Sequence, residues 1–421
     1  MYARFFGGSH PAGHKETTRR KAVASPDMPP RKVQLMLKGR RCVVSNGARV
    51  TLGQCIAEPV GEDDVALHAS VSGTVELVTE EKVVLRNDGK DSVCPELFPW
   101  SESHAPNARQ LAVVMRNAGI VGMSSGDGQP AHKKLVAAAA APVDTLIVNG
   151  VECDPWHTAD HRLMLEQPDK VVGGADLLRQ ALGVKRAIIA VAGDKLDAVN
   201  ALEAEREALG EHGVTIKTLR RRYPLGEERI LTGVLTGRQV PLGANPIAVR
   251  CVVFNVATAA AVYDAVVEGR PVTHRIVTVT GTAVVKPRNL LAPIGMPVRE
   301  LPDSTDGLRG ELVKTYLGGP MRGRVIHDED SAVEKNAAVV EKDTAAVVVL
   351  RVAGSHPRRG KSVCIRCGEC VSACPMGLLP LYARTGEEGG REACVSCGAC
   401  SAVCPAELPL HEWMSRKEEG Q

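Results

Sequence analysis

Residues 364–375 read CIRCGECVSACP, and residues 394–405 read CVSCGACSAVCP. Both runs follow the pattern CxxCxxCxxxCP, and together they contain eight of the 13 cysteines. This spacing is typical of a chain that holds two [4Fe–4S] clusters through thiolates. It is far more specific than the CxxC pairs of a structural zinc site, which is the competing interpretation. We therefore expect the C-terminal part of the chain to carry electrons.

The doubled run also predicts which cysteines hold which cluster. Three cysteines of one run act together with the fourth cysteine of the other run. The first cluster is assigned to Cys364, Cys367, Cys370 and Cys404. The second cluster is assigned to Cys394, Cys397, Cys400 and Cys374. Such clusters transfer one electron at a time and cannot accept hydride, so a connection to nicotinamide would require a flavin elsewhere in the chain.

Length and charge limit the class of protein. A chain of 421 residues is long enough for about three domains, and its net charge of +3 does not favour nucleic acid as the main partner. Residues 1–15 lack the apolar core of a signal peptide, and no run of about 18 apolar residues predicts a membrane-spanning helix. Because free thiolates require a reducing compartment, we expect a protein of the cytoplasm or of the cytoplasmic face of the cell membrane.

The expected fold class is multidomain, α/β plus β. Residues 1–105 contain short apolar pieces separated by glycines, which predict strands and turns. The pieces ARVTLGQCIAE (48–58) and ALHASVSGTVELV (66–78) are similar to the two halves of a barrel-sandwich of the biotinyl or lipoyl type. The segment between them, PVGEDDV, has no lysine that could be modified. A structural role is therefore favoured over a swinging-arm carrier.

Strands and helices alternate in residues 106–265, which predicts a doubly wound α/β domain with ligands beyond the carboxyl ends of its strands. Residues 266–354 are expected to form a compact β-grasp domain, including a helix after residue 330 and the strand AAVVVLRV. Residues 355–421 are expected to form an α-helical domain of the two-cluster ferredoxin type.

Several stretches resemble the RnfC family, among them GGSHPAGHK, VNGVECDPWHTADHRLM, RRYPLGEE, FNVATAAA and GGPMRG. This family is the peripheral subunit of the Rnf ion-translocating ferredoxin:NAD oxidoreductase complex, and it is similar to the flavin subunit of respiratory complex I. The resemblance covers nearly the whole chain. It implies FMN on the α/β domain, NAD(H) beyond it and an SLBB-like β-grasp domain. The implied partners are the membrane subunits of an Rnf-type complex and a ferredoxin or flavoprotein.

The resemblance also implies a set of flavin-site residues. They are Asn149, Glu152, Asp154 and Thr158 in one motif, Tyr223, Gly226, Glu227 and Glu228 in a second, Asn255 and Thr258 in a third, and Lys133 or its neighbour Lys134. Two other interpretations of residues 152–161 stay open, a polar loop that caps a helix and a metal site.

The chain departs from the family in two places. Relatives carry a glycine-rich loop GLGGAGFPT before the lysine, whereas residues 122–130 read GMSSGDGQP. Asp127 would add negative charge beside a phosphate, and Gln129 replaces the phenylalanine against which relatives stack nicotinamide. The 19 residues between Cys374 and Cys394, residues 375–393, also form a shorter spacer than the resemblance implies. The altered loop favours a second hypothesis, a flavin-free iron–sulfur conduit or scaffold for another reductase. The intact segments 149–160 and 223–228 favour a flavin-containing electron-transfer subunit.

Overall fold

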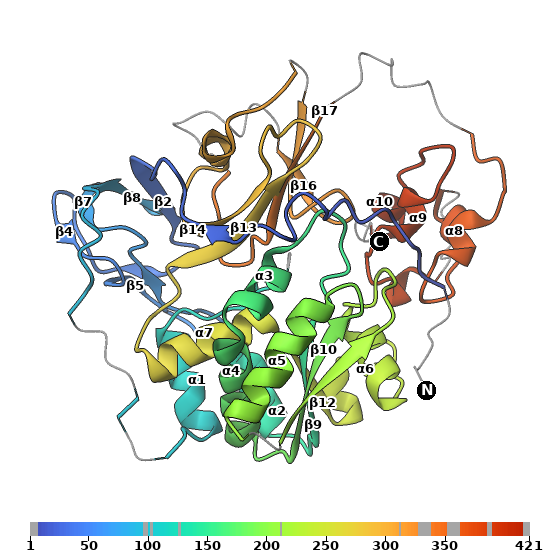
Figure 1. The fold of residues 1–421 in the computed structure, drawn as a ribbon, viewed down its shortest axis with the longest axis horizontal. Coiled ribbons are helices and arrows are strands. Elements are labelled where there is room, and N and C mark those ends of the chain that lie inside the picture. Colours follow the sequence, from blue (N-terminus) through green and yellow to red (C-terminus); the bar gives the residue numbers. More distant parts are fainter. Residues whose placement is uncertain are drawn as a thin grey trace, which may run out of the picture.

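The computed structural model of the chain describes residues 7–95, 100–101, 104–124, 128–210, 213–310, 313–326, 338–351, 363–384 and 390–415. Figure 1 shows an α/β region beneath two regions rich in strands, with the C-terminal cysteine module at one side. No helix in these ranges is long and apolar enough to cross a membrane.

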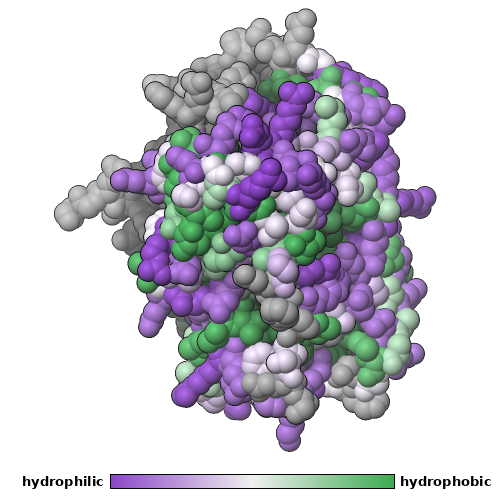
Figure 2. Space-filling view, turned by 90° about the vertical axis from the view of Figure 1, so that its left-hand side faces the viewer, coloured by the Kyte–Doolittle hydropathy of each residue, from purple (hydrophilic) through white to green (hydrophobic). Residues whose placement is uncertain are grey.

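Two small sheets build the N-terminal β domain, in the orders β2-β8-β7-β4 and β3-β5-β6. Their inward side chains, such as Val33, Leu35 and Leu85, are fully or almost fully buried. This arrangement confirms the expected barrel-sandwich fold. On the face drawn in Figure 2, hydrophobic side chains form separate patches between hydrophilic ones. The strands are β2 Lys32–Met36, β3 Arg41–Cys42, β4 Arg49–Val50, β5 Cys55–Glu58, β6 Leu67–His68, β7 Gly73–Val78 and β8 Lys82–Asn87.

A parallel sheet of order β11-β10-β9-β12 forms the centre of the α/β domain. Both faces are covered, because Leu146 and Val148 of β9 pack on one side and Ile147 packs on the other. Near-continuous apolar strands of this kind are typical of a parallel sheet buried on both faces. The strands are β9 Thr145–Gly150, β10 Arg186–Ala192, β11 Val214–Leu219 and β12 Cys251–Asn255.

Helices cover this sheet unequally. Most of them share one core with the first face, whereas α6 packs on the second. Local signals mark their ends: Asn107 and Gln110 form a capping box at the start of α1, and Gly183 ends α4 in the left-handed conformation. The helices are α1 Ala108–Asn117, α2 Ala131–Ala139, α3 Ala159–Glu166, α4 Pro168–Leu182, α5 Leu196–Ala208, α6 Glu228–Thr236 and α7 Val256–Val267, with a 3-10 helix at Pro246–Val249.

The strand order creates a switch point between β9 and β12. From β9 the chain adds β10 and then β11 on one side, and it later returns to place β12 on the other side of β9. Connections that leave in opposite directions open a crevice at the carboxyl ends of these two strands, where ligands bind in such folds.

The loop between the two halves of the N-terminal β domain packs on the α/β domain. Arg116 of α1 donates to the Gly61 carbonyl at 2.9 Å, and His132 of α2 lies 3.0 Å from the Glu62 carbonyl. This loop is therefore an interdomain contact, which agrees with the structural role expected from its lack of lysine.

A third sheet, of order β1-β14-β13-β17-β15-β16, receives its edge strand from the N-terminus. The segment before β1 runs along the α/β domain instead of joining the N-terminal β domain. The predicted domain boundaries at 105, 265 and 354 stay predictions. The helix expected after residue 330 falls mainly on residues 327–337, outside the described ranges. The elements are β1 Val23–Ala24, β13 His274–Thr280, β14 Arg288–Pro293, β15 Val313–Leu317, β16 Arg324–Ile326 and β17 Ala346–Arg351, with a 3-10 helix at Val298–Thr305.

The cysteine module consists of short helices around the two runs. Gly368 and Gly398 occupy equivalent positions in the runs. Each glycine has the left-handed backbone conformation and directly precedes a short helix. The elements are α8 Glu369–Ser372, α9 Ala399–Ala402 and α10 Leu410–Ser415, with 3-10 helices at Pro380–Arg384 and Arg391–Ala393.

Candidate functional site

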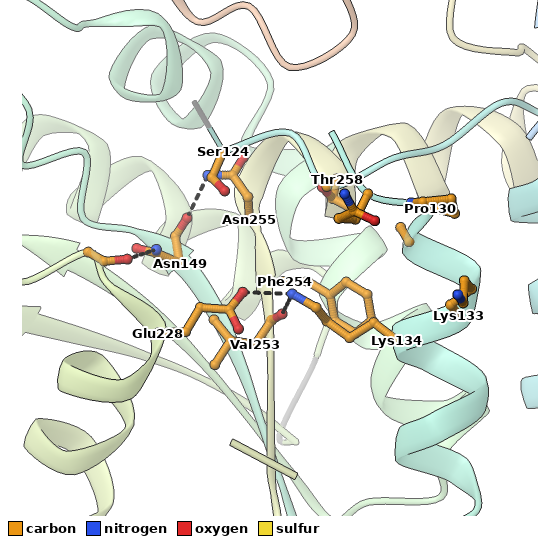
Figure 3. Close-up of a pocket in the computed structure, with 14 residues that line it drawn as sticks. Ser124, Pro130, Lys133, Lys134, Asn149, Glu228, Val253, Phe254, Asn255 and Thr258 are labelled. Atoms are coloured by element: carbon orange, nitrogen blue, oxygen red, sulfur yellow. Dashed lines mark hydrogen bonds and ion pairs between the residues drawn. The ribbon is translucent and has the colours of Figure 1, made fainter. Parts of the chain in front are cut away.

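A pocket of about 170 Å³ opens in the crevice between β9 and β12. Figure 3 shows that the residues of its wall come from the ends of both strands, from α2 and from the start of α6. Six of the predicted flavin-site residues line it, namely Lys133, Asn149, Gly226, Glu228, Asn255 and Thr258. Five others lie elsewhere, namely Glu152, Asp154, Thr158, Tyr223 and Glu227.

Two asparagines brace the strand ends behind the pocket. Asn149 and Asn255 are register partners on β9 and β12. The Asn149 amide donates to the Gly226 carbonyl at 2.8 Å. The Asn255 amide donates to the Asp160 carboxylate at 2.9 Å, and its oxygen accepts from the Ala257 amide, which caps α7. Their hydrogen bonds hold this wall in place, which is the pre-formed geometry that a ligand site needs.

Positive charge faces the pocket from the first turns of α2. Pro130 precedes this helix and provides no side-chain cap. Lys134 lies 2.6 Å from Glu228 Oε1, across the pocket, whereas Lys133 pairs with Asp63 of the N-terminal β domain. The Ala131 amide donates to the Ile120 carbonyl at 3.2 Å, but no side chain caps α2. A helix start next to lysines attracts anions, so this side of the pocket fits a phosphate group.

The apolar part of the pocket wall comes from β12, which contributes Phe254 and Val253. No motif in the sequence indicated Phe254. The available signal was its place directly before Asn255, at the carboxyl end of a buried strand. An aromatic side chain is thus present in the pocket although Gln129 replaces the loop phenylalanine.

The loop before α2 is anchored on the pocket side at Met123. Its amide donates to Thr258 Oγ1 at 3.0 Å, and its carbonyl accepts from Arg275 at 2.7 Å. Ser124, the next residue, lines the pocket. The substitutions predicted to matter at 125–127 lie outside the described residues.

Tyr223 and Glu227 serve other contacts. Tyr223 is 1% exposed, and its hydroxyl donates to the carbonyl of Cys397 in the cysteine module. The Glu227 carboxylate accepts from the Ile230 amide at 3.0 Å and caps α6. Tyr223 therefore connects the α/β domain to the second cysteine run.

Thr158 and Asp154 also bind protein groups. Thr158 Oγ1 forms buried hydrogen bonds with Thr18 at 2.9 Å and Asn289 at 2.8 Å. Asp154 pairs with Arg322 at 3.4 Å. These contacts join the N-terminal segment and the third sheet to the α/β domain.

Buried charges lie directly behind the pocket. Glu152, with a φ of 41°, accepts from the Asp160 amide at 2.8 Å, and Lys15 donates to the Glu152 carbonyl. The loop thus caps α3, as one alternative interpretation had it. Asp160 Oδ1 has no hydrogen-bond partner among the described residues, and Arg275 lies 3.8 Å away. Burial raises the pKa of Asp160 to about 6, and Arg275 only partly offsets this effect.

The cysteines of the two runs approach one another crosswise. Cys370 of the first run interacts electrostatically with Cys404 and Cys364. Cys397, of the second run, interacts instead with Cys374 and Cys394. Each fourth cysteine therefore lies beside cysteines of the opposite run, as ligand exchange requires.

Burial also makes these thiols hard to ionise. Burial, together with the nearby cysteines, raises the pKa of Cys397 to about 11 and that of Cys400 to about 12. Iron would have to displace these protons on binding, as metals do at thiol sites. In the described ranges, no three His, Cys, Asp or Glu side chains converge on a single metal ion. A [4Fe–4S] cluster instead spreads four thiolates over four irons.

Three family profiles match the chain. The Nuo51 FMN-binding domain matches residues 115–264, the RnfC barrel sandwich hybrid domain matches residues 3–96, and the 4Fe-4S dicluster domain matches residues 356–405. The first of these contains the pocket, and the third contains both cysteine runs.

Whole-chain relatives have consistent names. The C subunit of the Na(+)-translocating ferredoxin:NAD(+) oxidoreductase complex of Acetobacterium woodii is 35% identical, over 90% of this chain and 86% of its own. The proton-translocating counterpart of Clostridium ljungdahlii is 35% identical over 90% and 83%. The corresponding protein of the ion-translocating oxidoreductase complex of Pseudomonas aeruginosa is 38% identical over 81% of this chain and 44% of its own.

A solved structure shares the fold. The crystal structure of an NAD+-reducing [NiFe]-hydrogenase in the air-oxidized state aligns with a TM-score of 0.50 and 21% identity. The alignment covers 70% of this chain and 52% of the hydrogenase chain. At this identity the likeness concerns the fold alone.

Proposed function

This chain belongs to the RnfC family, and we propose that it passes electrons between a flavin site, with NAD(H) beyond it, and a ferredoxin-type partner or membrane complex. The electrons would travel through two [4Fe–4S] clusters. The observation that carries this proposal is the contact made by Tyr223. It lies three residues before Gly226 of the pocket wall, and its hydroxyl binds the carbonyl of Cys397.

FMN is the cofactor that fits the pocket. Lys134 and the start of α2, which has no side-chain cap, would hold its phosphate, and Phe254 and Val253 supply an apolar wall. The pocket sits at the switch point of a parallel sheet, where nucleotide-like ligands bind. When bound, a flavin exchanges hydride with nicotinamide on one side and single electrons with iron–sulfur clusters on the other. The protein groups would bind it, orient it and restrict water.

The cluster ligands are proposed as the crosswise sets. Cys364, Cys367, Cys370 and Cys404 would hold the first cluster. Cys394, Cys397, Cys400 and Cys374 would hold the second. Cys404 packs in one hydrophobic cluster with Cys364 and Cys370, and Cys374 packs with Cys394, which supports this division.

The second cluster is the proposed neighbour of the pocket. Cys397 packs in one buried core with Leu225 of the α/β domain. The first run faces outward instead, with Cys367 exposed and Ile365 66% exposed. Electrons would pass between the flavin and the second cluster, then the first, and then the partner at the exposed end.

The partners follow from the family. The relatives are named as subunits of ion-translocating complexes, so we propose that the chain docks to membrane subunits on the cytoplasmic face. A ferredoxin or flavoprotein would exchange electrons with the assembly.

The second candidate, a flavin-free conduit, is favoured by one observation. Lys134 is already neutralised by Glu228, so a phosphate must compete with a carboxylate for it. In this case the α/β domain would serve as a scaffold.

Anaerobic purification decides between the two candidates. We expect about eight irons per chain, broad cluster absorbance and one FMN released by acid. A matched pair of variants, Lys134→Ala and Lys133→Ala, tests the pocket, because only the first should reduce FMN retention strongly. Clusters without flavin, even after incubation with excess FMN, would refute the flavin site and leave the conduit. Absence of iron in anaerobically reconstituted protein would refute both.

A further inference from the structure

The cysteine module touches the rest of the chain beside its second cluster ligands. Tyr223 donates to the Cys397 carbonyl. The backbone of Gly398, the next residue, lies against the carbonyl of Met321, which follows β15. A Cβ atom on Gly398 would meet that oxygen at 2.1 Å. Only glycine permits so close an approach.

The N-terminal segment makes a third contact at the same place. The Gly8 amide donates to the Ala373 carbonyl at 3.0 Å, and a Cβ on Gly7 would lie 2.1 Å from the Cys374 carbonyl. Ser9 exchanges two backbone hydrogen bonds with Tyr223, at 2.8 and 2.9 Å. Two of the three contacts are thus locked to each other.

Charge completes the arrangement. Arg322, next to Met321, pairs with Asp154 and also interacts electrostatically with Tyr223 and Cys397. A guanidinium therefore lies near the second run, and its positive charge favours the reduced, more negative state of a nearby cluster.

The equivalent position in the first run is different. Gly368 has nearly the same conformation as Gly398, with φ values of 80° and 76°. A Cβ on Gly368 would nevertheless meet no atom of the described chain within 4 Å. The two runs share their sequence pattern and their local backbone, so the contact at Gly398 belongs to its tertiary surroundings.

We propose that residues 7–9, Tyr223 and residues 321–322 form a docking socket that positions the second cluster against the α/β domain and has no counterpart among the described residues around the first. This inference rests on the proposed electron-transfer function. It adds the residues that fix the distance between the flavin site and the second cluster. It also assigns a role to the GGSHP and GGPMRG stretches, which lie outside the pocket. Electron transfer slows steeply with distance. A small shift of the module should therefore lower the rate of electron transfer between the flavin and the second cluster.

The two glycines supply a matched experiment. Gly398→Ala and Gly368→Ala place the same left-handed strain in equivalent turns, but only Gly398→Ala drives a methyl group into the socket. In full-length protein with its clusters, we expect Gly398→Ala to speed amide hydrogen exchange in residues 7–14 by roughly tenfold. Gly368→Ala should leave that exchange unchanged. Equal exchange in the two variants would overturn the proposal.

Cluster measurements give a readout that a purely structural contact would not move. After photoreduction of bound flavin, the Gly398→Ala variant should reduce its clusters roughly tenfold more slowly. Its second-cluster EPR signal and potential should shift by more than Gly368→Ala shifts those of the first cluster, because both variants strain a turn beside a ligand but only Gly398→Ala meets the socket. An unchanged rate and signal would overturn the proposal.

Tyr223→Phe keeps the test decisive if Gly398→Ala does not fold. This variant removes only the hydroxyl that binds the Cys397 carbonyl. We expect a smaller change of the same kind, in hydrogen exchange and in the second EPR signal. No change in either would overturn the proposal. Hydrogen exchange needs no flavin, so failure of the flavin site and failure of the socket are distinguishable.

Discussion

In the cysteine module, all the proposed ligands lie between residues 364 and 404, and their spacing alone predicts the chemistry. In the pocket, the lining residues come from separate segments between residues 122 and 258, and only six of eleven predicted positions reach it. The difference lies in where the constraint acts. Clusters demand thiolates at fixed short intervals, whereas a flavin-type pocket can take its polar groups from any strand end that the sheet brings near.

The largest expected effect tests whether the spacing of the cysteines correctly assigns the ligands of the two clusters. Cys374→Ser lies in the first run but should destroy mainly the second cluster, because ligands are exchanged between the runs. We expect iron to fall from about eight to about four atoms per chain. EPR should lose the signal that Cys394→Ser also removes. Loss of the signal removed by Cys364→Ser instead would contradict the crosswise sets.

The next effect concerns the buried carboxyl behind the pocket. The pKa of Asp160 is about 6 in the folded chain, against about 3.9 when unfolded. Its contribution to stability is therefore fully present below about pH 4 and is lost as pH rises to and through about 6. Relative to Asp160→Asn, the wild type should lose up to about 3 kcal/mol of unfolding free energy across that window.

Urea unfolding of wild type and Asp160→Asn at several pH values from about 4 to 7 measures this difference. Subtracting the two curves removes the titration of all groups that do not interact with Asp160. A difference that stays constant with pH would show that Asp160 does not titrate in this window.

The pocket's positive charge should have a smaller effect. Lys134→Ala should weaken FMN binding by about 1–2 kcal/mol, because a partly buried charge-assisted hydrogen bond to phosphate is lost. Lys133→Ala, whose ammonium pairs with Asp63, should change binding by less than about 0.5 kcal/mol. Fluorescence titration of flavin-depleted protein measures both. Equal losses would show that both lysines serve the pocket.

The smallest effect compares the surroundings of the two clusters. Arg322→Gln should lower the reduction potential of the second cluster by roughly tens of millivolts, because a nearby positive charge is removed. Arg366→Gln removes an exposed positive charge between Cys364 and Cys367, and it is the comparison variant for the first cluster. EPR-monitored redox titration reads both clusters at once. If Arg322→Gln shifted the reduction potential of the first cluster instead, Arg322 would not lie closest to the second cluster.

Much of the architecture was predictable. The alternation of strands and helices in residues 106–265 follows from apolar runs, and the barrel-sandwich was indicated by the likeness of residues 48–58 and 66–78 to its two halves. Glu152, Asp154 and Thr158 show why a motif does not give a site by itself. They lie close in sequence to Asn149, but the chain turns after β9 and directs them to α3, the N-terminal segment and the third sheet.

Residues that sequence reasoning missed are informative in the same way. Phe254 reaches the pocket because β12 lies beside β9, a pairing across about 100 residues that no local pattern encodes. The sequence left open Lys133 or Lys134, and it is Lys134 that pairs across the pocket, because the helix rotates successive side chains by roughly 100°. One residue of register decides between them.

By itself, the sequence determined the cofactor type of the C-terminal module and the classes of the domains. Thiolate spacing and apolar periodicity are local properties, written in neighbouring residues. Only the tertiary structure decided which cysteine run lies near the pocket and which glycine is indispensable. Gly368 and Gly398 have the same neighbours in sequence pattern and nearly the same φ. They differ because the turn after β15 lies against Gly398, whereas a Cβ on Gly368 would have no neighbour within 4 Å among the described residues.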